Sequence, residues 1–551
     1  MDGTGGVRKS NKGKNRVPLR ALARVASVAV GVQFGWAIQL SLLTPYVQEL
    51  GIPHTFASYI WLCGPISGMI VQPVVGHYSD NWPGSWGRRR PFIVVGAILV
   101  VLAVLLIGFS SDLGYLLGDS PTSRIRAITV FVLGFWILDL ANNTLQGPCR
   151  ALLADYTGKD QRRTRRGNAF FSLFMAVGNV LGFAAGSFYN WPMVFPFTKT
   201  AGCNLACANL KSAFLVDIVI LALTTLLSVT AAQEIPWSPD KKKSQYHSIA
   251  PSTPLLRDTR DAVQENDTQG EPRKVNVNSL GTIQNDNDDS DSDEETVLSE
   301  AFLWELFGSF RDLPKPMWFV LLITALTWFA WFPFLLFDTD WMGREVYMGE
   351  PNSKDIQLGQ RYSVGVEMGS FGLMLNSVVL GISSLLIEPV CRRVHTTYVW
   401  ASANMILAAC FASTAVISLA SKSAASSQNL QPPISITVAA LAVFAILGAP
   451  LAVTYSVPYA LTASFTSSSG GGQGLSMGVL NLAIVLPQIV VSVGSGPWDA
   501  LFGGGNMPSF LFAAAAAFIG GLLALFLLPK TQRQREFSST GIVRTHSCPI
   551  P

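Results

Sequence analysis

An all-helical membrane protein with twelve membrane-spanning helices is the fold class that this sequence predicts. Of its 551 residues, 49% are hydrophobic and only 13% are charged, whereas roughly a quarter of the residues in soluble domains are charged. The apolar residues fall in long blocks, and about twenty apolar residues are enough to cross a bilayer core. Because the backbone of such a block must satisfy its own hydrogen bonds in lipid, each block is expected to be helical. The composition argues against a soluble protein, a nucleic-acid-binding protein or a disulfide scaffold.

Each expected span is an apolar stretch with few or no charges. In the first half of the chain the spans are 22–44, 58–77, 91–111, 126–146, 168–188 and 212–232, and in the second half they are 317–337, 365–387, 397–420, 434–455, 474–495 and 508–528. The polar segment between the two sets contains an acidic run from Asp286 to Glu295 and few aromatic residues, which predicts a flexible linker. The expected organisation is a tail 1–21, a six-helix half 22–232, the linker 233–316, a second six-helix half 317–528 and a tail 529–551.

Basic residues predict the orientation of the spans. Lys and Arg are concentrated in the N-terminal tail and in the loops that follow spans two, four, six and eight, while the loops 45–57 and 496–507 contain none. Cytoplasmic loops are enriched in Lys and Arg, so both termini and the linker are expected to be cytoplasmic. Arg344, Lys354 and Arg361 run against this pattern. The basic N-terminus does not have the form of a removable signal peptide, so the first span is expected to remain as a helix.

Six plus six spans around a cytoplasmic linker is the layout of a major-facilitator transporter, in which two similar halves rock about a site at the midplane. The loop after span two resembles the Gly/Asp/Gly/Arg loop motif of that superfamily. It contains Gly76, Asp80, Gly87, Arg88, Arg89 and Arg90. In the superfamily the carboxylate and the arginines clamp neighbouring helix ends, which implies a gating role here. Simple anchoring by positive charge is the alternative.

Longer strings resemble the plant sucrose–proton symporters, in the glycoside–pentoside–hexuronide branch of the superfamily. They are FGWAIQLSLLTPYVQELGIPH (34–54), WLCGP (61–65), GRRRPF (87–92), LGFWILDLANNTLQGPCRALLAD (133–155), FSLFMAVGNVLG (171–182), LFDTDWMGRE (336–345), TYSVPYAL (454–461) and GVLNLAIVLPQ (478–488). The resemblance implies proton-coupled symport of sucrose and related glucosides toward the cytosol by alternating access, without a cofactor. The opening of span one and the stretch CNLACANLKSAF (203–214) lean toward the clade whose members are often vacuolar, so the vacuolar and plasma membranes are both open.

Asp139 is the residue that most strongly indicates a functional site, because it lies near the middle of span four. A carboxylate there is disfavoured by roughly 3 kcal/mol on insertion scales and usually has a function. The family resemblance implies that Asp139 binds the proton, and we take it to be the only acid deep inside a span of the first half. A neutral Asp that joins two helices by a hydrogen bond is the alternative.

Arg150 follows Asp139 by eleven residues, about 16 Å along a straight helix, so the two side chains cannot meet in that geometry. Gly147 and Pro148 intervene and favour a bend. Arg150 could bind sugar hydroxyls or neutralise the carboxylate during the return step, and the resemblance implies an essential arginine at this position. An arginine that extends from the helix end toward water is the alternative.

The string DTDWMGRE places Asp338, Trp341 and Glu345 on one face if span seven continues as a helix. The resemblance implies substrate or coupling roles for Asp338, Arg344 and Glu345. An exposed ion pair between Asp340 and Arg344 is the alternative for that arginine. Sugars also need aromatic faces, for which the candidates are Trp36, Trp331, Phe332 and Trp341.

His54 ends the first outer loop, where an acidic compartment could protonate it. The resemblance implies a substrate-accessible histidine, and an exposed polar loop residue is the alternative. Cys203 and Cys207 share another outer loop, and whether they are oxidised stays open.

The spacing of the other histidines indicates no metal site, and the sequence contains no nucleophile or nucleotide-binding motif. An ion gradient is therefore the expected energy source, and a sugar sensor on the same scaffold is the alternative to a sucrose and proton carrier in the bilayer. The sequence does not predict an oligomeric state.

Overall fold

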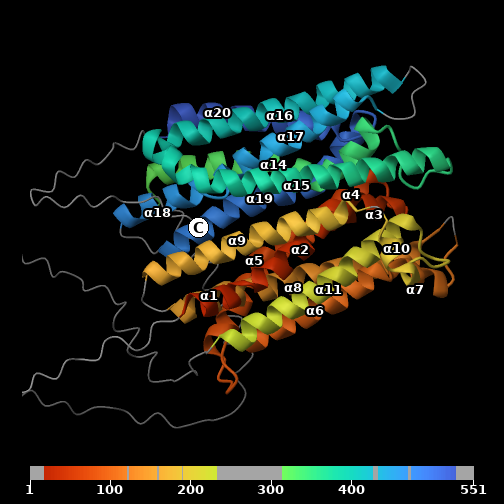
Figure 1. Ribbon diagram of the computed structural model, residues 1–551. Helices are drawn as coiled ribbons and strands as arrows, with labels where there is room; N and C mark the ends of the chain where they lie inside the picture. The colour runs from red at the N-terminus through yellow and green to blue at the C-terminus, as the bar shows by residue number, and fades with distance from the viewer. Residues whose placement is uncertain are drawn as a thin grey trace, which may run out of the picture. The chain divides into compact units, whose positions relative to one another are not determined.

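Long helices running side by side make up almost the whole computed structural model (Figure 1). It describes residues 18–120, 123–157, 161–188, 190–232, 313–425, 432–469 and 473–528. The tails and nearly all of the predicted linker 233–316 lie outside these ranges. Within the described residues the extended structure is limited to two isolated bridges, Ser120 with Ser123 and Thr200 with Cys203.

The helices of the first half occupy the residues up to Ala231. They are α1 (Leu19–Ala26), α2 (Val28–Ile38), the π-helix η1 (Gln39–Leu43), α3 (Thr44–Glu49), α4 (His54–Ile60), α5 (Cys63–Asn81), α6 (Arg90–Gly108), α7 (Ser110–Leu116), α8 (Ile125–Thr157), α9 (Gln161–Gly186), α10 (Trp191–Val194), the 3₁₀ turn η2 (Pro196–Thr198) and α11 (Leu205–Ala231). Short helices such as α7 and α10 cover one end of the long ones.

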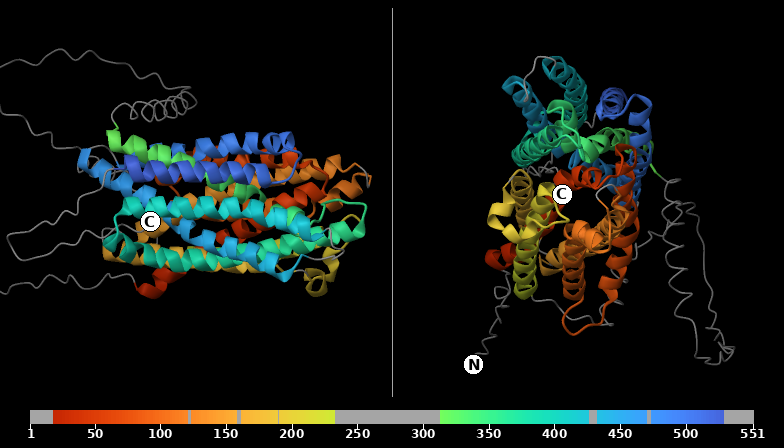
Figure 2. Two further views of the ribbon diagram at one scale, coloured as in Figure 1. Left: turned by 90° about the horizontal axis from the view of Figure 1, so that it is seen from above. Right: turned by 90° about the vertical axis from the view of Figure 1, so that its right-hand side faces the viewer.

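The second half repeats this plan with longer helices. They are α14 (Lys315–Trp341), the π-helix η3 (Met342–Val346), α15 (Ile356–Arg393), α16 (Thr396–Ala425), α17 (Ile434–Thr454), α18 (Val457–Ser469), α19 (Gln473–Leu501) and α20 (Met507–Leu527). Figure 2 shows the bundle end-on, with the red-to-yellow helices of the first half on one side and the green-to-blue helices of the second half on the other. The described residues belong to one compact unit.

Twelve helical segments in the described ranges are long and apolar enough to cross a membrane, and each overlaps one of the twelve predicted spans. The predicted fold class is therefore confirmed. The segments are often longer than the hydropathy of the sequence suggests. Span seven, for example, runs from Lys315 to Val346, because the π-helix η3 continues α14 without a break. Asp338 and Glu345, which lie beyond the predicted span 317–337, are consequently inside a membrane helix.

Small residues allow the helices of each half to approach closely. A side chain at Gly178 or Gly182 of α9 would place its Cβ 2.4 Å from the Val30 carbonyl oxygen or 2.6 Å from the Phe34 carbonyl oxygen of α2. Gly448 of α17 has the same role, because its Cβ would lie 2.4 Å from the Asn376 backbone oxygen of α15. Small residues at helix contacts are typical of membrane proteins, where van der Waals packing drives association.

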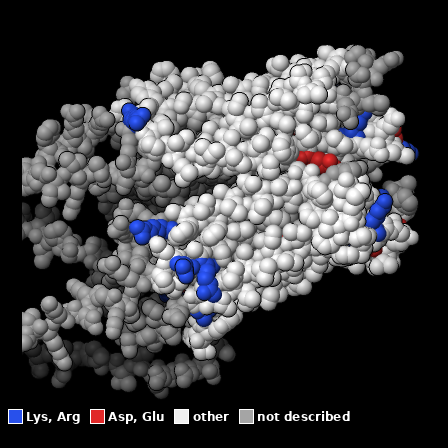
Figure 3. Space-filling view, viewed as in Figure 1, with Lys and Arg blue, Asp and Glu red and all other residues white. Residues whose placement is uncertain are grey.

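The two halves meet along α9 and α15 and along α4 and α19. We call the end of the bundle that carries α3, α4, α7 and α10, on the right in Figure 1, the His54 end, and the opposite end the Arg89 end. Figure 3 shows Lys and Arg near both ends of one face and mostly uncharged surface between them. This distribution fits a body that spans a bilayer.

Candidate functional site

Asp139 is buried on α8, with a relative exposure of 2%. Its Oδ2 accepts a hydrogen bond from the Ser67 hydroxyl of α5 over 3.1 Å. Gly64 also lies against the carboxylate, because a Cβ there would be 3.3 Å from Oδ2. The structure therefore places this predicted site residue between two helices of the first half, where a charge has little access to water.

A chain of donors leads to the Asp139 carboxylate. Gln72 Nε2 donates to Asn143 Oδ1 over 2.8 Å, and Asn143 Nδ2 donates to the Ser67 oxygen over 2.8 Å. Asn143 Nδ2 also lies 2.9 Å from the backbone oxygen of Asp139. These bonds hold Ser67 so that its hydroxyl can donate to the carboxylate, and a donor of this kind stabilises the ionised form.

Asp217 shows that the prediction of one deep acid in the first half was wrong. It lies in α11, buried to 1% exposure, and its Oδ1 has no hydrogen-bond partner among the described residues. Its Oδ2 is 2.9 Å from the position that a Cβ of Gly35 on α2 would take. Asp217 is the sixth residue of the predicted span 212–232, so the sequence contained the signal and the assignment overlooked it.

Arg150 lies on the same helix as Asp139, past Pro148, and contacts α9. Its Nη2 is 3.9 Å from Met175 Sδ, and its guanidinium carbon is 5.4 Å from the centre of the Phe171 ring. The structure thus places Arg150 and Asp139 among different neighbours, as the eleven-residue spacing predicted. The guanidinium has no carboxylate among these contacts, so it is available to a polar substrate.

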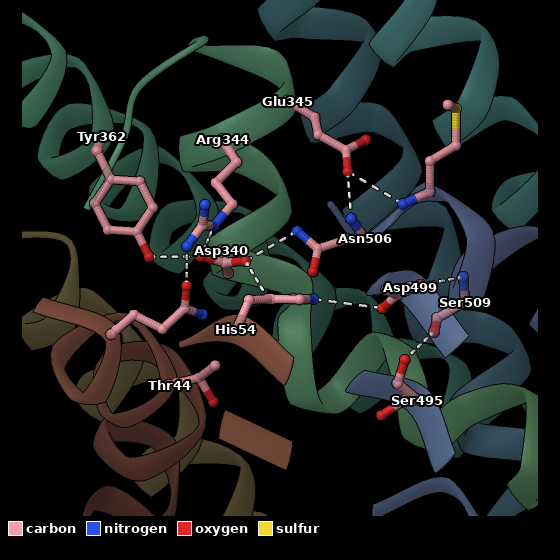
Figure 4. Close-up of polar contacts among 12 residues, drawn as sticks. Thr44, His54, Asp340, Arg344, Glu345, Tyr362, Ser495, Asp499, Asn506 and Ser509 are labelled. Atoms are coloured by element: carbon pink, nitrogen blue, oxygen red, sulfur yellow. Dashed lines mark hydrogen bonds and ion pairs between the residues drawn. The ribbon is translucent and has the colours of Figure 1, made fainter. Parts of the chain in front are cut away.

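A polar cluster at the His54 end joins residues of both halves (Figure 4). Asp340 of α14 is at its centre with an exposure of 0%. Its Oδ1 accepts from Arg344 Nε over 3.0 Å and from the Tyr362 hydroxyl over 2.6 Å, and its Oδ2 accepts from Asn506 Nδ2 over 3.0 Å. Arg344 also donates to Gln48 of the first half. The Asp340–Arg344 pair is therefore buried at its acidic end, and its interpretation as an exposed surface pair is wrong.

His54 begins α4 and is nearly buried, with a side-chain exposure of 11%. Its Nδ1 lies 3.5 Å from Asp340 Oδ2, and its Nε2 lies 3.4 Å from Asp499 Oδ2 on α19. The ring also packs on Phe337, with 4.5 Å between ring centres. The interpretation of His54 as an exposed loop residue is therefore wrong, because the side chain points into the junction between the two halves.

Asp338 and Glu345 lie in different surroundings although both are buried. Asp338 Oδ1 accepts from the Thr339 backbone N–H over 2.6 Å, and its Oδ2 has no partner in the described part of the chain. Glu345 Oε1 accepts from the backbone N–H groups of Asn506 and Met507 over 2.5 and 3.1 Å, and its Oε2 accepts from the Ser418 hydroxyl. Glu345 thus ties η3 to α16 and to the start of α20, whereas Asp338 keeps a free acceptor.

Three of the four predicted aromatic residues, Trp331, Phe332 and Trp341, lie on α14 and are buried. Trp331 and Trp341 are both fully buried, and their indole N–H groups donate to Thr454 and Ser418 over 3.1 and 2.9 Å. Trp341 packs on Phe444 and Phe510. Trp36 of α2 differs from them, because its buried Nε1 has no partner among the described residues.

The loop motif forms a clamp at the Arg89 end. Arg89 pairs with Asp80, donates to the Ser79 hydroxyl over 2.5 Å and reaches Asp155 Oδ2 of α8 over 3.2 Å. Arg88 Nη2 lies 2.7 Å from Asp155 Oδ1. The clamp therefore connects the ends of α5 and α8 with the start of α6. Arg90 begins α6, and its buried Nε has no hydrogen-bond partner in the described residues.

Cys203 and Cys207 form a disulfide at the start of α11, which settles their state in this structure. Near them, Lys211 is buried, pairs with Asp112 and lies 4.5 Å from the centre of the Phe109 ring. No group of three or more His, Cys, Asp or Glu side chains in the described ranges could hold a metal ion.

Besides Asp340, which was predicted only as an ion-pair partner of Arg344, four residues of the polar cluster were missed as site residues in the sequence. They are Gln48, Tyr362, Asp499 and Asn506. Asp499 lies beyond the predicted span 474–495, in the stretch 496–507 that was predicted to be a loop, so it lacked the signal that identified Asp139. The other three are ordinary polar residues near helix ends, and only the fold brings them to Asp340 or Arg344.

Comparisons with known proteins agree with this architecture. Residues 25–490 match the family described as Major Facilitator Superfamily. Among curated proteins, the chain is 53% identical over 523 residues to Sucrose transport protein SUT2 of Oryza sativa subsp. indica, covering 94% of each chain. It is also 53% identical to Sucrose transport protein SUC4 of Arabidopsis thaliana, covering 95% of this chain and 92% of that protein.

Solved structures of transporters share the fold. A D-xylose-proton symporter has a TM-score of 0.57 at 13% identity, with coverage of 93% of this chain and 99% of that chain. A mutant of the nucleoside transporter NupG has a TM-score of 0.57 at 12% identity, with coverage of 92% of this chain and 99% of that chain. At these identities the likeness concerns the fold alone.

Proposed function

The chain belongs to the sucrose transport proteins of the major facilitator superfamily, and from that premise we propose that it carries sucrose together with protons across a membrane. The near full-length identity of 53% to two sucrose transport proteins is the observation that carries the choice of sucrose. Related glucosides are the further substrates that this family membership suggests.

Coupling to protons is assigned to Asp139. Its carboxylate is buried in a membrane helix and accepts from Ser67, so the surrounding groups can hold either the charged or the neutral form. Protonation removes a buried charge, so the carrier loaded with a proton can rearrange more easily than the charged one. A ligand drives such a change only by the difference in its affinity for the two states. Sucrose and the proton, bound together, would provide this difference in affinity between the two access states.

The substrate contacts are assigned to Arg150 and Asp338, with Arg344, Glu345 and His54 acting nearer the His54 end. Arg150 contacts Met175 and Phe171 rather than a carboxylate, and Asp338 Oδ2 has no partner in the described residues. Arg150 is exposed, so its guanidinium is open to a sugar hydroxyl, whereas the Asp338 oxygen is a buried acceptor without a donor among the described residues. Arg344 and Glu345 are engaged in contacts within the protein, so their role would be to shape and close the site.

Movement between the two access states is assigned to the clamp of Asp80, Arg88, Arg89 and Arg90 and to the contacts at the His54 end. The clamp holds α5, α6 and α8 together, so that the first half would move as one body. The polar contacts that connect the halves toward the opposite end include His54 with Asp340, His54 with Asp499, Arg344 with Gln48, and the Thr339 hydroxyl with the Ser41 backbone oxygen over 2.9 Å. Alternating access requires that such contacts break and form again.

Both termini and the linker are assigned to the cytoplasm, on the basis of the Lys and Arg in the loops. The His54 end then faces the lumen or the exterior, and symport with protons moves sucrose toward the cytosol. The vacuolar and the plasma membrane both fit this direction. A fluorescent fusion imaged beside markers of the two membranes decides between them, and a protein found only at the plasma membrane excludes the vacuolar assignment.

Uptake of radiolabelled sucrose into proteoliposomes tests the function. We expect accumulation above the outside concentration when a proton gradient is imposed, and equilibration without it. A preparation that binds sucrose without uptake under either condition would contradict transport and favour a sensor. Accumulation that ignores the proton gradient would contradict symport while leaving sucrose transport intact.

A further inference from the structure

His54 lies between two carboxylates from different helices of the opposite half. Its Nδ1 is 3.5 Å from Asp340 Oδ2 of α14, and its Nε2 is 3.4 Å from Asp499 Oδ2 of α19. His54 itself belongs to the first half, and both acids belong to the second (Figure 4). The imidazole therefore bridges the two halves of the transporter at the His54 end.

Only one ring nitrogen of His54 makes a hydrogen bond: Nε2 bonds to Asp499, while Nδ1 lies within ion-pair distance of Asp340 without a hydrogen bond. The position between two carboxylates favours an additional proton, because a charged imidazole is attracted by both. A neutral imidazole has one N–H donor and one bare nitrogen, whereas an ionised carboxylate only accepts. If His54 were neutral and both acids were ionised, one ring nitrogen would face a carboxylate oxygen without a hydrogen between them. A charged imidazole, or a proton on one of the acids, removes that unfavourable contact, so the arrangement favours one proton more than a neutral histidine and two carboxylates would hold.

The charges around His54 support the same count. Asp340 and Asp499 are fully buried, so as two carboxylates they would bring two negative charges against the one positive charge of Arg344. A proton on the His54 cluster brings the net charge of these groups to zero. Buried charges are tolerated when opposite charges compensate them. The other titratable groups close by are directed elsewhere: Glu345 accepts from Asn506, Met507 and Ser418, Tyr362 donates to Asp340, and Glu49 accepts from Asn204.

Asp499 is fixed by the connection between α19 and α20. Its Oδ1 accepts from the Ser509 backbone N–H over 2.8 Å, so Oδ2 is left for the histidine. The same connection supplies Asn506, which donates to Asp340 and, through its backbone, to Glu345. It passes through three glycines with positive φ, and a Cβ on Gly505 would lie 2.9 Å from Glu345 Oε1. This hairpin thus holds both acids in place for His54.

We propose that closure of the His54 end binds one proton in the His54–Asp340–Asp499 bridge, and that Asp499 is the positioning residue that makes this binding site. This inference rests on the proposed alternating access and adds to it a proton site separate from Asp139. When the halves separate, His54 leaves both carboxylates and enters water, where a histidine is mostly neutral above about pH 7. The closed state therefore gains stability as the pH on that side falls.

The test measures closure directly, without reliance on transport. Spin labels at Leu116 of α7 and Ile356 of α15, both strongly exposed at this end, report the distance between the halves in the full chain in nanodiscs. With one linked proton, the ratio of closed to open molecules should fall about tenfold per pH unit above pH 7 and level off at acidic pH. A ratio that does not change with pH overturns the proposal.

Two variants and a control test whether the pH dependence of closure comes from the His54–Asp340–Asp499 bridge. Asp499→Asn offers an amide donor to a neutral His54 while keeping an acceptor for Ser509, so the end should close without pH dependence. His54→Gln should lose the pH dependence as well. It provides the test of the bridge if Asp499→Asn does not fold. Asp355→Asn changes a carboxylate that only caps α15 at Gln357 and should keep the wild-type tenfold change. A wild-type pH response in either bridge variant contradicts the proposal, whereas failure of sucrose uptake with an intact pH response contradicts only the transport assignment.

Discussion

The hydroxyl of Ser67 donates to the carboxylate of Asp139 over 3.1 Å and joins α5 to α8 in the middle of the first half. Asn143 donates to the same hydroxyl oxygen and aligns it. A donor favours the ionised carboxylate by about 1 kcal/mol, close to one pH unit of proton affinity. Ser67 therefore helps to set how readily the proposed coupling residue releases its proton.

Replacing Ser67 by Ala should shift the pH dependence of transport. Without the donor, Asp139 holds its proton to higher pH, so we expect the pH at half-maximal sucrose uptake to rise by about 0.5 to 1 unit. Thr144→Ala on α8 is the control, because that hydroxyl donates to the Leu140 carbonyl of its own helix. Uptake profiles of Ser67→Ala and wild type that superimpose from about pH 5 to 8 would contradict a role for the hydroxyl.

Arg89 should contribute more to stability than its neighbour Arg88. Arg89 is nearly buried and contacts Asp80, Ser79 and Asp155, whereas Arg88 makes a half-exposed pair with Asp155. We expect Arg89→Ala to cost about 1 to 3 kcal/mol and to lower the Tm by several degrees, while Arg88→Ala costs under about 1 kcal/mol. Thermal unfolding of the two purified variants measures the difference, and equal Tm values would argue against a clamp centred on Arg89.

The disulfide between Cys203 and Cys207 should form on the side of the membrane opposite the termini. Alkylation without prior reduction should leave both cysteines unmodified in mass spectra, and reduction should lower thermal stability by about 2 kcal/mol, the value for a short closed loop. A double Cys203→Ser, Cys207→Ser variant provides the reduced reference. Full alkylation of both residues in the native membrane would contradict an oxidised pair and the assignment of this end to the lumen or exterior.

A tag in the linker tests the orientation independently. A protease site inserted at Ser290, which lies outside the described residues, should be cut in intact vesicles only from the cytosolic side. Insertion in a long polar segment should leave the helices unaffected, and retained sucrose uptake is the control. Cleavage only from the luminal side would reverse the direction of transport and the position of the His54 bridge.

The spans could be predicted because hydropathy is a local property of the sequence. Blocks such as 91–111 contain no alternative to a membrane helix, and the structure has α6 there. The ends of the spans were harder to predict, because a polar string such as DTDWMGRE is typical of a loop. Such a string can continue a membrane helix when its charged side chains have buried partners. Arg344 pairs with Asp340 and Gln48 in the structure, and these contacts let span seven continue to Val346.

The site was only partly accessible from the sequence. Asp139 could be predicted as a site residue without knowledge of its neighbours, because an acid within an apolar block usually has a function. The partner of His54 could not, since Asp499 is 445 positions away and reaches the histidine only when α4 packs on α19. Asp217 had the same signal as Asp139 and differs from it in the structure, where its Oδ1 has no described partner and Asp139 accepts from Ser67.

This contrast provides a matched pair of variants for the coupling mechanism. Asn has the shape of a protonated Asp and can form similar hydrogen bonds, but it cannot titrate. Asp217→Asn replaces a buried acid that lies against Gly35 and away from the Ser67 chain, so it should keep most of the proton-coupled accumulation. Asp139→Asn should still bind sucrose, since the polar side chain remains. Substitution of Arg150, by contrast, should cripple transport while leaving proton binding at Asp139 intact.

The sucrose-evoked proton current of Asp139→Asn tests the central claim most directly. Wild type and Asp217→Asn should each give a current on addition of sucrose at acidic pH, and Asp139→Asn should give none and should only equilibrate sucrose. Equal protein amounts and equal sucrose binding in the three proteins are the conditions for the comparison. A normal, pH-dependent current in Asp139→Asn, with sucrose accumulated against its gradient, would contradict the account and transfer the coupling role to another acid, with Glu345 as the next to be tested.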